Sequence, residues 1–309
     1  MTVIETQQPF HYFKRYHIPL ISELAVTVHG EIKRNSCNWN PYDPPLFNHV
    51  EIETFNRCNN DCAFCPANMH VDKRKPIHLK EEIFSEIVRQ LKQLRYTGWI
   101  YPFHNNEPLL DSRMASFISE IRMNLPHAGI GVWTNGILLD FDKLTELYSN
   151  GLNGKALLRI NDYTDDMKMS ARMQQLLSDI RGTQIEKDLT IVFQLRDKNA
   201  RLTRRGGNAP NRLGESTWRV DDWITQKRWC SWPFRQFNVN SSGLVHICCN
   251  DVYYENIVGD MNKETMIDIW RGKQLARIRN ELNTNGRRNL SPCSRCDTIT
   301  SRFTWEPGQ

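Results

Sequence analysis

Nine cysteines are the residues of this chain whose type and spacing most clearly indicate chemistry. Eight of them form two groups, one within residues 58–65 and one within residues 230–296, and the ninth is Cys37. Disulfide frameworks are typical of short secreted chains, whereas this chain is long and begins without the apolar segment of an export signal. Grouped cysteines in such a chain indicate metal ligands.

The first group, Cys58, Cys62 and Cys65, has the spacing CxxxCxxC and directly follows a segment with the pattern of a strand. Thiolates at this spacing can each bind one iron of a [4Fe–4S] cluster, which leaves one iron without a protein ligand. A small molecule can bind at such an open position, as it does at catalytic zinc sites. The alternatives are an incomplete zinc site and unconnected thiols, but no nearby CxxC or HxxxH completes a zinc site.

The segment RCNNDCAFCP resembles the signature of the radical S-adenosylmethionine (SAM) enzymes, including the aromatic Phe64 before the third cysteine. The resemblance covers roughly residues 48–300 and implies an abbreviated (β/α) barrel. It also implies that SAM binds at the open iron of the cluster. One-electron reduction then breaks the sulfonium, and the resulting 5′-deoxyadenosyl radical abstracts a hydrogen atom from a substrate.

The same resemblance implies SAM contacts at the ends of the following strands. Asn106 and Glu107 lie in HNNEP, where the family has GGEP, and the Glu107 carboxylate would accept a hydrogen bond from the methionine ammonium. The family pattern further suggests Asn135, Asn161 near the ribose, and Arg196 paired with the SAM carboxylate. For these last three residues, an ordinary polar role in a loop is the alternative.

The second group resembles the C-terminal extension called Twitch, a shorter relative of SPASM. Its members are Cys230, Cys248, Cys293 and Cys296, with Gly243 at the turn of a predicted hairpin. The resemblance implies that the four thiolates complete a closed auxiliary [4Fe–4S] cluster, which suits electron transfer. A zinc ribbon is the alternative, and one CxxC with two dispersed cysteines fits it poorly.

Cys37 and Cys249 are then the two cysteines that are not assigned as ligands of either cluster. Cys37 is interpreted as an incidental thiol, whereas Cys249 adjoins a predicted ligand at the end of a predicted strand. If Cys248 faces the auxiliary cluster, Cys249 faces away from it, toward the mouth of the barrel. The sequence does not decide which of the two binds iron, and packing as a small hydrophobic residue is the alternative for Cys249.

A thiol can donate a hydrogen atom to a carbon radical, so Cys249 could return hydrogen to the face opposite the abstraction and invert the carbon. Two clusters, a short C-terminal extension and this spare cysteine resemble radical SAM epimerases of aminoglycoside biosynthesis, as in the conversion of neomycin C to neomycin B. The expected function is therefore that of an isomerase. The alternatives are a Twitch-type dehydrogenase of an aminocyclitol or sugar alcohol, a peptide-modifying radical SAM enzyme, and a non-catalytic iron–sulfur protein.

This reading implies two partners: a polycationic aminosugar substrate, and an external one-electron donor of the flavodoxin or ferredoxin type. A polycation favours an acidic pocket, although each acid could equally be a solvated surface residue. The candidate acids are Glu53, Asp162, Asp221, Asp222 and Asp251.

The composition limits the other partners. The chain has 309 residues, a net charge of +5, 39% hydrophobic and 24% charged residues, which is typical of a globular protein. This charge is too small to indicate binding to nucleic acid or a membrane surface. Because no apolar run reaches the length of a membrane span, we expect a cytoplasmic protein without membrane association.

The elements that must position these residues form an α/β pattern. Strands are predicted at 49–55, 99–103, 129–134, 155–160 and 189–195, and helices at 80–95, 112–124, 141–149 and 165–180. This alternation predicts a parallel sheet in a partial barrel, with chemistry at the carboxyl ends of the strands. A hairpin at 236–247 and a helix at 264–282 follow. The predicted domains are an N-terminal wrap (1–47), the barrel (48–214) and the Twitch domain (215–309).

Overall fold

A single sheet of nine strands organises the part of the chain that the computed structural model describes, which is residues 4–6, 40–164, 167–195, 203–209, 229–296 and 298. Its order is β1-β6-β5-β4-β3-β2-β7-β8-β9. The strands are β1 (Ile4–Thr6), β2 (His49–Ile52), β3 (Trp99–Tyr101), β4 (Gly129–Thr134), β5 (Ala156–Asp162), β6 (Thr190–Leu195), β7 (Gln236–Val239), β8 (Leu244–His246) and β9 (Ile257–Asp260).

The strands from β1 to β7 in this order pair in parallel, and β7, β8 and β9 pair antiparallel. The five predicted barrel strands and the predicted hairpin are all present. Ile4–Thr6, within the predicted N-terminal wrap, form β1, which was not predicted and pairs with β6. Three residues are too few to show a period, so only the distant partner reveals the strand. β9 was not predicted either.

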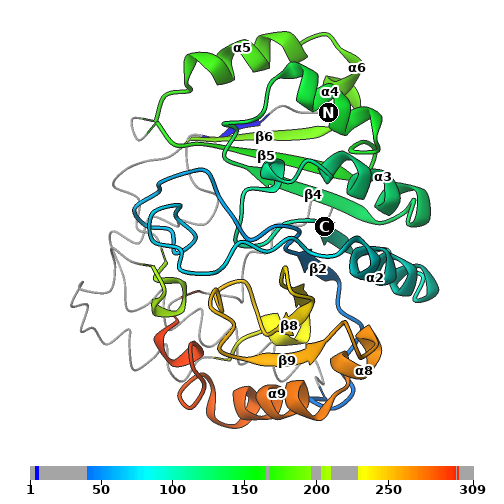
Figure 1. Cartoon of the computed structure of the whole chain (residues 1–309), viewed down its shortest axis with the longest axis vertical. Helices are drawn as coiled ribbons and strands as arrows, with labels where there is room; N and C mark the ends of the chain where they lie inside the picture. Colours follow the sequence, from blue (N-terminus) through cyan, green and yellow to red (C-terminus); the bar gives the residue numbers. More distant parts are fainter. Residues whose placement is uncertain are drawn as a thin grey trace.

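Helices follow the barrel strands in alternation: α2 (Glu81–Gln93), α3 (Met114–Asn124), α4 (Phe141–Ser149), α5 (Ala171–Ile180) and α6 (Gln184–Asp188). The C-terminal region adds α8 (Met266–Trp270) and α9 (Lys273–Asn285). Short 3₁₀ helices are η1 (Pro108–Leu110), η2 (Arg205–Gly207), η4 (Trp232–Phe234) and η5 (Cys293–Arg295). Figure 1 shows α2, α3, α4 and α5 one after another along the outer side of the sheet.

Two helix predictions differ from the structure. The helix predicted at 165–180 begins at Ala171, where the Ser170 side chain accepts a hydrogen bond from the Met173 N–H (3.4 Å). The helix predicted at 264–282 is two helices, because Gly272 adopts an extended conformation (φ −66°, ψ 153°) between α8 and α9. The spacing of apolar residues continues across this glycine, so the spacing alone does not reveal the break. The short helix α6 was not predicted.

The two faces of the sheet have different compositions, because successive residues of a strand point to opposite sides. The outer face packs against the helices in the main hydrophobic core, to which β2 contributes Val50 and Ile52, and β4 contributes Ile130 and Val132. These side chains are completely buried. The burial of each of these side chains stabilises the fold by about 1.5–3 kcal/mol.

The inner face holds a second, separate cluster of aromatic side chains. It consists of Trp99, Tyr101, Phe103, Leu157 and Val192, with Trp133 packed against them. Gly129 and Gly131 lie on the same face of β4. A Cβ atom at Gly129 would lie 2.5 Å from Cδ2 of Trp99, and one at Gly131 would overlap the ring of Tyr101. Glycines in this strand therefore provide the space that the aromatic rings occupy.

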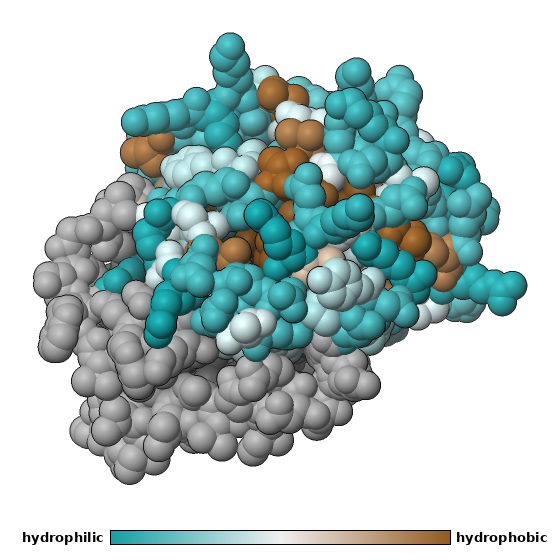
Figure 2. Space-filling model, turned by 90° about the horizontal axis from the view of Figure 1, so that it is seen from below, coloured by the Kyte–Doolittle hydropathy of each residue, from teal (hydrophilic) through white to brown (hydrophobic). Residues whose placement is uncertain are grey.

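Figure 2 shows one face of the molecule, on which the described residues are mostly hydrophilic, with hydrophobic residues in smaller areas between them. Among the described residues, none of the helices combines the length and the apolar character needed to cross a bilayer.

Replacing Gly129 with alanine tests the contact on the inner face. Because the new methyl group would overlap the Trp99 ring, we expect Gly129→Ala to lower the free energy of unfolding by about 1–3 kcal/mol. Chemical denaturation measures this value. In a Trp99→Ala background the same substitution should cost almost nothing, since the ring is gone. An equal cost in both backgrounds would contradict the steric explanation.

Candidate functional site

The loop after β2 presents the first cysteine group at the carboxyl end of the sheet. Cys58, Cys62 and Cys65 are half-buried, and a turn forms where the Cys65 N–H donates to the Cys62 carbonyl (2.9 Å). Burial, with the nearby charges of Glu107 and Cys65, raises the pKa of Cys58 to about 11. The side-chain N–H of Asn135 lies 3.8 Å from the Cys58 sulfur.

Glu107 connects this loop to the next strands. Its backbone N–H donates to the carbonyl of Arg57 (2.8 Å). Its carboxylate accepts hydrogen bonds from Thr134 Oγ1 (2.6 Å), the Asn135 N–H (2.8 Å) and the Leu109 N–H (3.1 Å). Burial raises its pKa. A carboxylate can accept about four hydrogen bonds, so Glu107 retains capacity for one further donor, and its predicted contact to SAM stays a prediction.

The other predicted SAM contacts lie around the same strand ends. Asn135 donates to Asn59 Oδ1 (2.8 Å), and Asn161 is 3.5 Å from the carbonyl of Thr134. The side-chain oxygen of Asn106 accepts from the His104 N–H (2.8 Å), and its buried Nδ2 has no hydrogen-bond partner among the described residues. Arg196 lies outside the described residues.

Tyr163 is a residue of this region that sequence reasoning missed. Its ring lies 5.9 Å from the ring of Phe64, which precedes the third cysteine. Its side chain remains exposed, at 37% of its surface. An aromatic residue directly after β5 was the only available signal. Glu107 and Asn135 thus contact the loop of the first cysteine group directly, and Tyr163 approaches Phe64 within it. Asn106 and Asn161 contact His104 and Thr134 at the neighbouring strand ends instead.

The second cysteine group is buried and comes together from three segments. Cys230 precedes η4, Cys248 follows β8, and Cys293 and Cys296 lie in and directly after η5. Each exposes less than a tenth of its surface. Burial raises the pKa of the Cys248 thiol, and its neighbour Cys249 and the other three members of the group raise it further. The four thiols therefore lie close enough together to influence one another's ionisation.

Two polar residues accompany this group. Asn250 Nδ2 lies 3.6 Å from the sulfur of Cys296. The buried Arg287 donates to the carbonyls of Cys296 (3.1 Å) and Thr298 (2.8 Å). Burial opposes the charge of Arg287, but the nearby cysteines raise its pKa. Sequence reasoning missed Arg287, because nothing in the sequence distinguishes it from the other basic residues.

Both cysteine groups have donor sets that fit iron–sulfur clusters. Thiolates are the usual protein ligands of these clusters, and N–H groups near the sulfurs tune them. Within the described residues no three His, Cys, Asp or Glu side chains form a site for one metal ion. The fit therefore rests on the chemistry, number and shared burial of the thiols. None of the described cysteines forms a disulfide.

Cys249 is more exposed than the four cysteines of the second group. β8 ends at His246, so both Cys248 and Cys249 lie in the following turn, and the prediction that they occupy a strand was wrong. Cys249 is half-buried, unlike Cys248. Its carbonyl accepts from Asn105 Nδ2 (3.2 Å) and Arg205 Nη2 (3.0 Å). Burial, followed by the charge of Glu51, raises the pKa of its thiol.

A buried polar cluster lies on the inner face of β2. Glu51 forms hydrogen bonds with Nδ1 of His104 and with Nε2 of His49 (2.8 Å). Burial favours the neutral carboxyl, but the two histidines hold the pKa of Glu51 well below its usual range. The ring of His104 packs edge-on against His246, with centroids 4.7 Å apart. Neither Glu51 nor His104 was predicted from the sequence as a site residue.

Several buried polar atoms of the inner face and its rim make no hydrogen bond to any described residue. They are Nε2 of His104, Nε1 of Trp133, Nε of Arg159, Oε1 of Gln236, Oδ1 of Asn238 and both ring nitrogens of His246. Buried polar groups are normally satisfied by protein, water or ligand. The inner face therefore offers donors and acceptors to a polar molecule.

The acids predicted to bind a substrate are engaged within the protein instead. Glu53 binds Arg74 (2.8 Å) and the hydroxyl of Tyr254 (2.6 Å). Asp162 accepts from the Ser170 N–H (2.7 Å), and Asp251 accepts from two backbone N–H groups of its own turn. Asp221 and Asp222 lie outside the described residues.

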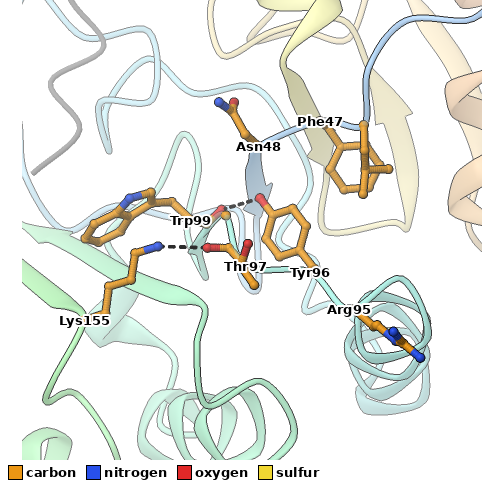
Figure 3. Close-up of a pocket in the computed structure, with 9 residues that line it drawn as sticks. Phe47, Asn48, Arg95, Tyr96, Thr97, Trp99 and Lys155 are labelled. Atoms are coloured by element: carbon orange, nitrogen blue, oxygen red, sulfur yellow. Dashed lines mark hydrogen bonds between the residues drawn. The ribbon is translucent and has the colours of Figure 1, made fainter. Parts of the chain in front are cut away.

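A cavity of about 370 Å³ lies at the opposite, amino-terminal end of the strands. Figure 3 shows its walls, where Lys155 donates to the carbonyl of Thr97 (2.8 Å) and the Tyr96 hydroxyl donates to the carbonyl of Trp99 (3.0 Å). No cysteine lines it. Chemistry in parallel α/β folds takes place at the carboxyl end of the strands, so this cavity is not the candidate site.

Two family models match the chain. Residues 52–175 match the radical SAM superfamily, and residues 230–297 match SPASM, an iron–sulfur cluster-binding domain. These matches identify the cofactors as SAM, the SAM-binding [4Fe–4S] cluster and an auxiliary iron–sulfur cluster. The predicted identity of the cofactors is therefore confirmed. Which residues bind them stays a prediction.

The chain is also similar to individual proteins. It is 24% identical to the S-adenosyl-L-methionine-dependent 2-deoxy-scyllo-inosamine dehydrogenase of Niallia circulans, over 82% of this chain and 94% of that protein. The crystal structure of BtrN in complex with AdoMet and 2-DOIA has a TM-score of 0.68 at 20% identity, covering 83% of this chain and 95% of the other. Native anSMEcpe with bound AdoMet has a TM-score of 0.51 at 12% identity, covering 82% and 88%. The structural likenesses confirm the predicted partial-barrel fold.

Iron content distinguishes the roles of the two adjacent cysteines. If Cys248 is a ligand and Cys249 is not, Cys248→Ala should lose roughly four of about eight irons per chain, whereas Cys249→Ala should keep them all. Iron analysis and electron paramagnetic resonance after anaerobic reconstitution provide the measurement. The reverse result would assign the ligand to Cys249.

Proposed function

We propose that this chain, a member of the radical SAM superfamily that ends in a SPASM-type iron–sulfur domain, inverts one carbon of an amine-bearing sugar of the aminoglycoside class. Hydrogen returned from Cys249 would complete the inversion, as in the conversion of neomycin C to neomycin B.

When bound, SAM and its cluster supply a 5′-deoxyadenosyl radical that removes one hydrogen atom from the substrate. The first cysteine group would hold the cluster, and Glu107 would accept a hydrogen bond from the SAM ammonium. Cys249 would then donate the hydrogen atom of its S–H bond to the opposite face of the substrate carbon. The sulfur radical left at Cys249 would take up a proton from solvent and one electron that the auxiliary cluster relays from the external donor. The conversion is therefore redox-neutral for the substrate.

The observation that carries this proposal is the position of Cys249. It is half-buried beside four buried thiols, and Asn105 and Arg205 hold its carbonyl. Asn105 belongs to the loop after β3, so the contact joins the Cys249 turn to the carboxyl end of the barrel. This placement supports a thiol that faces the substrate rather than iron.

The inner face supports the substrate class. Its buried, unpartnered polar atoms offer hydrogen bonds to a molecule with several hydroxyl and amino groups. Glu51 and its two histidine partners, His49 and His104, add further polar groups to this face. The dehydrogenase of Niallia circulans carries an aminocyclitol in its name, which is a molecule of similar chemistry.

Dehydrogenation is the second candidate, and the comparisons favour it over epimerisation, because the similar protein is named as a dehydrogenase. In this reaction the substrate alcohol loses a hydrogen atom, a proton and an electron and becomes a ketone. The electron would pass to the auxiliary cluster, and Cys249 would have no role. Either reaction needs an external one-electron donor, for which a flavodoxin or ferredoxin type is proposed.

Turnover in heavy water separates the two reactions. With neomycin C as substrate, Cys249 with an exchanged S–D bond should place one deuterium on the inverted carbon and give a product about one mass unit heavier. A ketone product about two mass units lighter, without that label, would establish dehydrogenation instead. Mass spectrometry and carbon NMR of the product provide the measurement.

Substitution of Cys249 tests the donor directly. We expect Cys249→Ala and Cys249→Ser to abolish epimerisation while still forming 5′-deoxyadenosine, because neither alanine nor a strong O–H bond donates hydrogen readily. Cys37→Ala serves as the matched control and should retain full activity. Epimerisation by Cys249→Ala would exclude this residue as the donor.

A further inference from the structure

Arg287 is a cation enclosed next to the second cysteine group. It exposes only 1% of its surface and follows α9 directly in the sequence. A guanidinium stays protonated in proteins, so this position carries a full positive charge. Enclosing a charge without a compensating partner costs a large free energy. The surroundings of Arg287 must therefore supply negative charge or strong dipoles.

The dipoles around Arg287 are few. Its Nη1 donates to the carbonyls of Cys296 (3.1 Å) and Thr298 (2.8 Å), and its buried Nε has no partner among the described residues. No carboxylate of the described residues forms an ion pair with it. Among the described residues, the carbonyl groups of Cys296 and Thr298 are therefore the only hydrogen-bond acceptors of Arg287.

Arg279 is a second buried arginine of the same region, and different groups contact its guanidinium. It donates to the carbonyls of Pro233 (2.8 Å), Trp270 (2.6 Å) and Pro41 (3.3 Å). Its guanidinium carbon also lies 4.0 Å from the ring centroid of Trp270. Carbonyl dipoles and an aromatic face surround this guanidinium, but burial still lowers the pKa of Arg279 to about 9 because no negative charge of the described residues lies beside it. Arg287 has no such ring among its described contacts.

What surrounds Arg287 is the second cysteine group, whose member Cys296 it contacts directly. Four thiolates around an iron–sulfur cluster give the site a net negative charge, and reduction adds one more. A fixed positive charge at this position stabilises the reduced cluster more than the oxidised one. Net charge and hydrogen bonds near the sulfurs set the potentials of such clusters.

We propose that Arg287 is the counter-ion of the auxiliary cluster and raises its reduction potential. The raised potential brings the cluster within reach of a one-electron donor. This role concerns the cluster alone and is independent of whether the substrate is inverted or oxidised. Arg287 acts here as a positioning charge and has no contact with the substrate.

A redox titration of the auxiliary cluster tests this role. The titration uses the reconstituted full chain with Cys58→Ala, Cys62→Ala and Cys65→Ala, so that only the auxiliary cluster contributes to the electron paramagnetic resonance signal. Arg287→Met should lower the equilibrium constant for reduction at least tenfold, which is a shift of ~59 mV to more negative potential. Arg287→Lys, which keeps the charge, should shift the potential much less. Arg279→Met is the matched control and should leave the potential unchanged.

Each result decides the proposal. An unchanged potential in Arg287→Met with full iron content overturns it, as does an equal shift in Arg287→Lys and Arg287→Met. If Arg287→Met fails to hold the cluster, iron content is compared with Arg287→Gln and Arg287→Lys. If only the lysine variant retains the iron of the auxiliary cluster, the result supports a requirement for positive charge. If all three variants lose this iron, the proposal is overturned. It is also overturned if Arg287→Gln retains the iron without a shift in potential.

Discussion

The carboxylate of Glu107 is the interaction on which the arrangement of the barrel mouth depends. It accepts hydrogen bonds from Thr134 and Asn135 at the end of β4 and from Leu109 in η1, while its own N–H binds Arg57 beside the first cysteine. A buried donor left without a partner costs about 1–3 kcal/mol. The ends of three neighbouring strands therefore keep one relative position, and the cysteine loop is fixed against the strands that would hold SAM.

The sheet separates stability from chemistry by its two faces. Side chains such as Val50 and Ile130 on the outer face pack against helices and form the main core. The inner face instead combines aromatic rings with polar groups such as His104 and Arg159, each of which has a buried nitrogen without a hydrogen bond to any described residue. A polar inner face lowers the stability that the sheet alone could provide, and this loss is expected where a fold must bind a polar molecule.

Local patterns allowed the sequence to predict the barrel strands, the hairpin and both cysteine groups, because the spacing of ligands and the alternation of apolar residues are short-range features. Residues brought together over long distances were missed. Glu51 and His104 are 53 positions apart in the sequence, and the parallel pairing of β2 with β3 brings them together. Arg287 is one of 40 basic residues until the fold buries it. The distinction between Cys248 and Cys249 depends on a turn rather than on strand alternation, so no periodicity could reveal it.

The parallel pairing of β2 with β7 makes the sheet continuous from the barrel into the C-terminal region. β2 leads into the loop of the first cysteine group, and the β7–β8 hairpin leads to Cys248. One hydrogen-bonded ladder therefore connects the segments that lead to the two groups. Electron tunnelling falls off steeply with distance, so clusters bound at the two groups would exchange electrons at a rate that this ladder helps to fix. Because Cys230 precedes β7 and Arg205 holds the Cys249 carbonyl, a change in the length of the segment between β6 and β7 would disturb the second group.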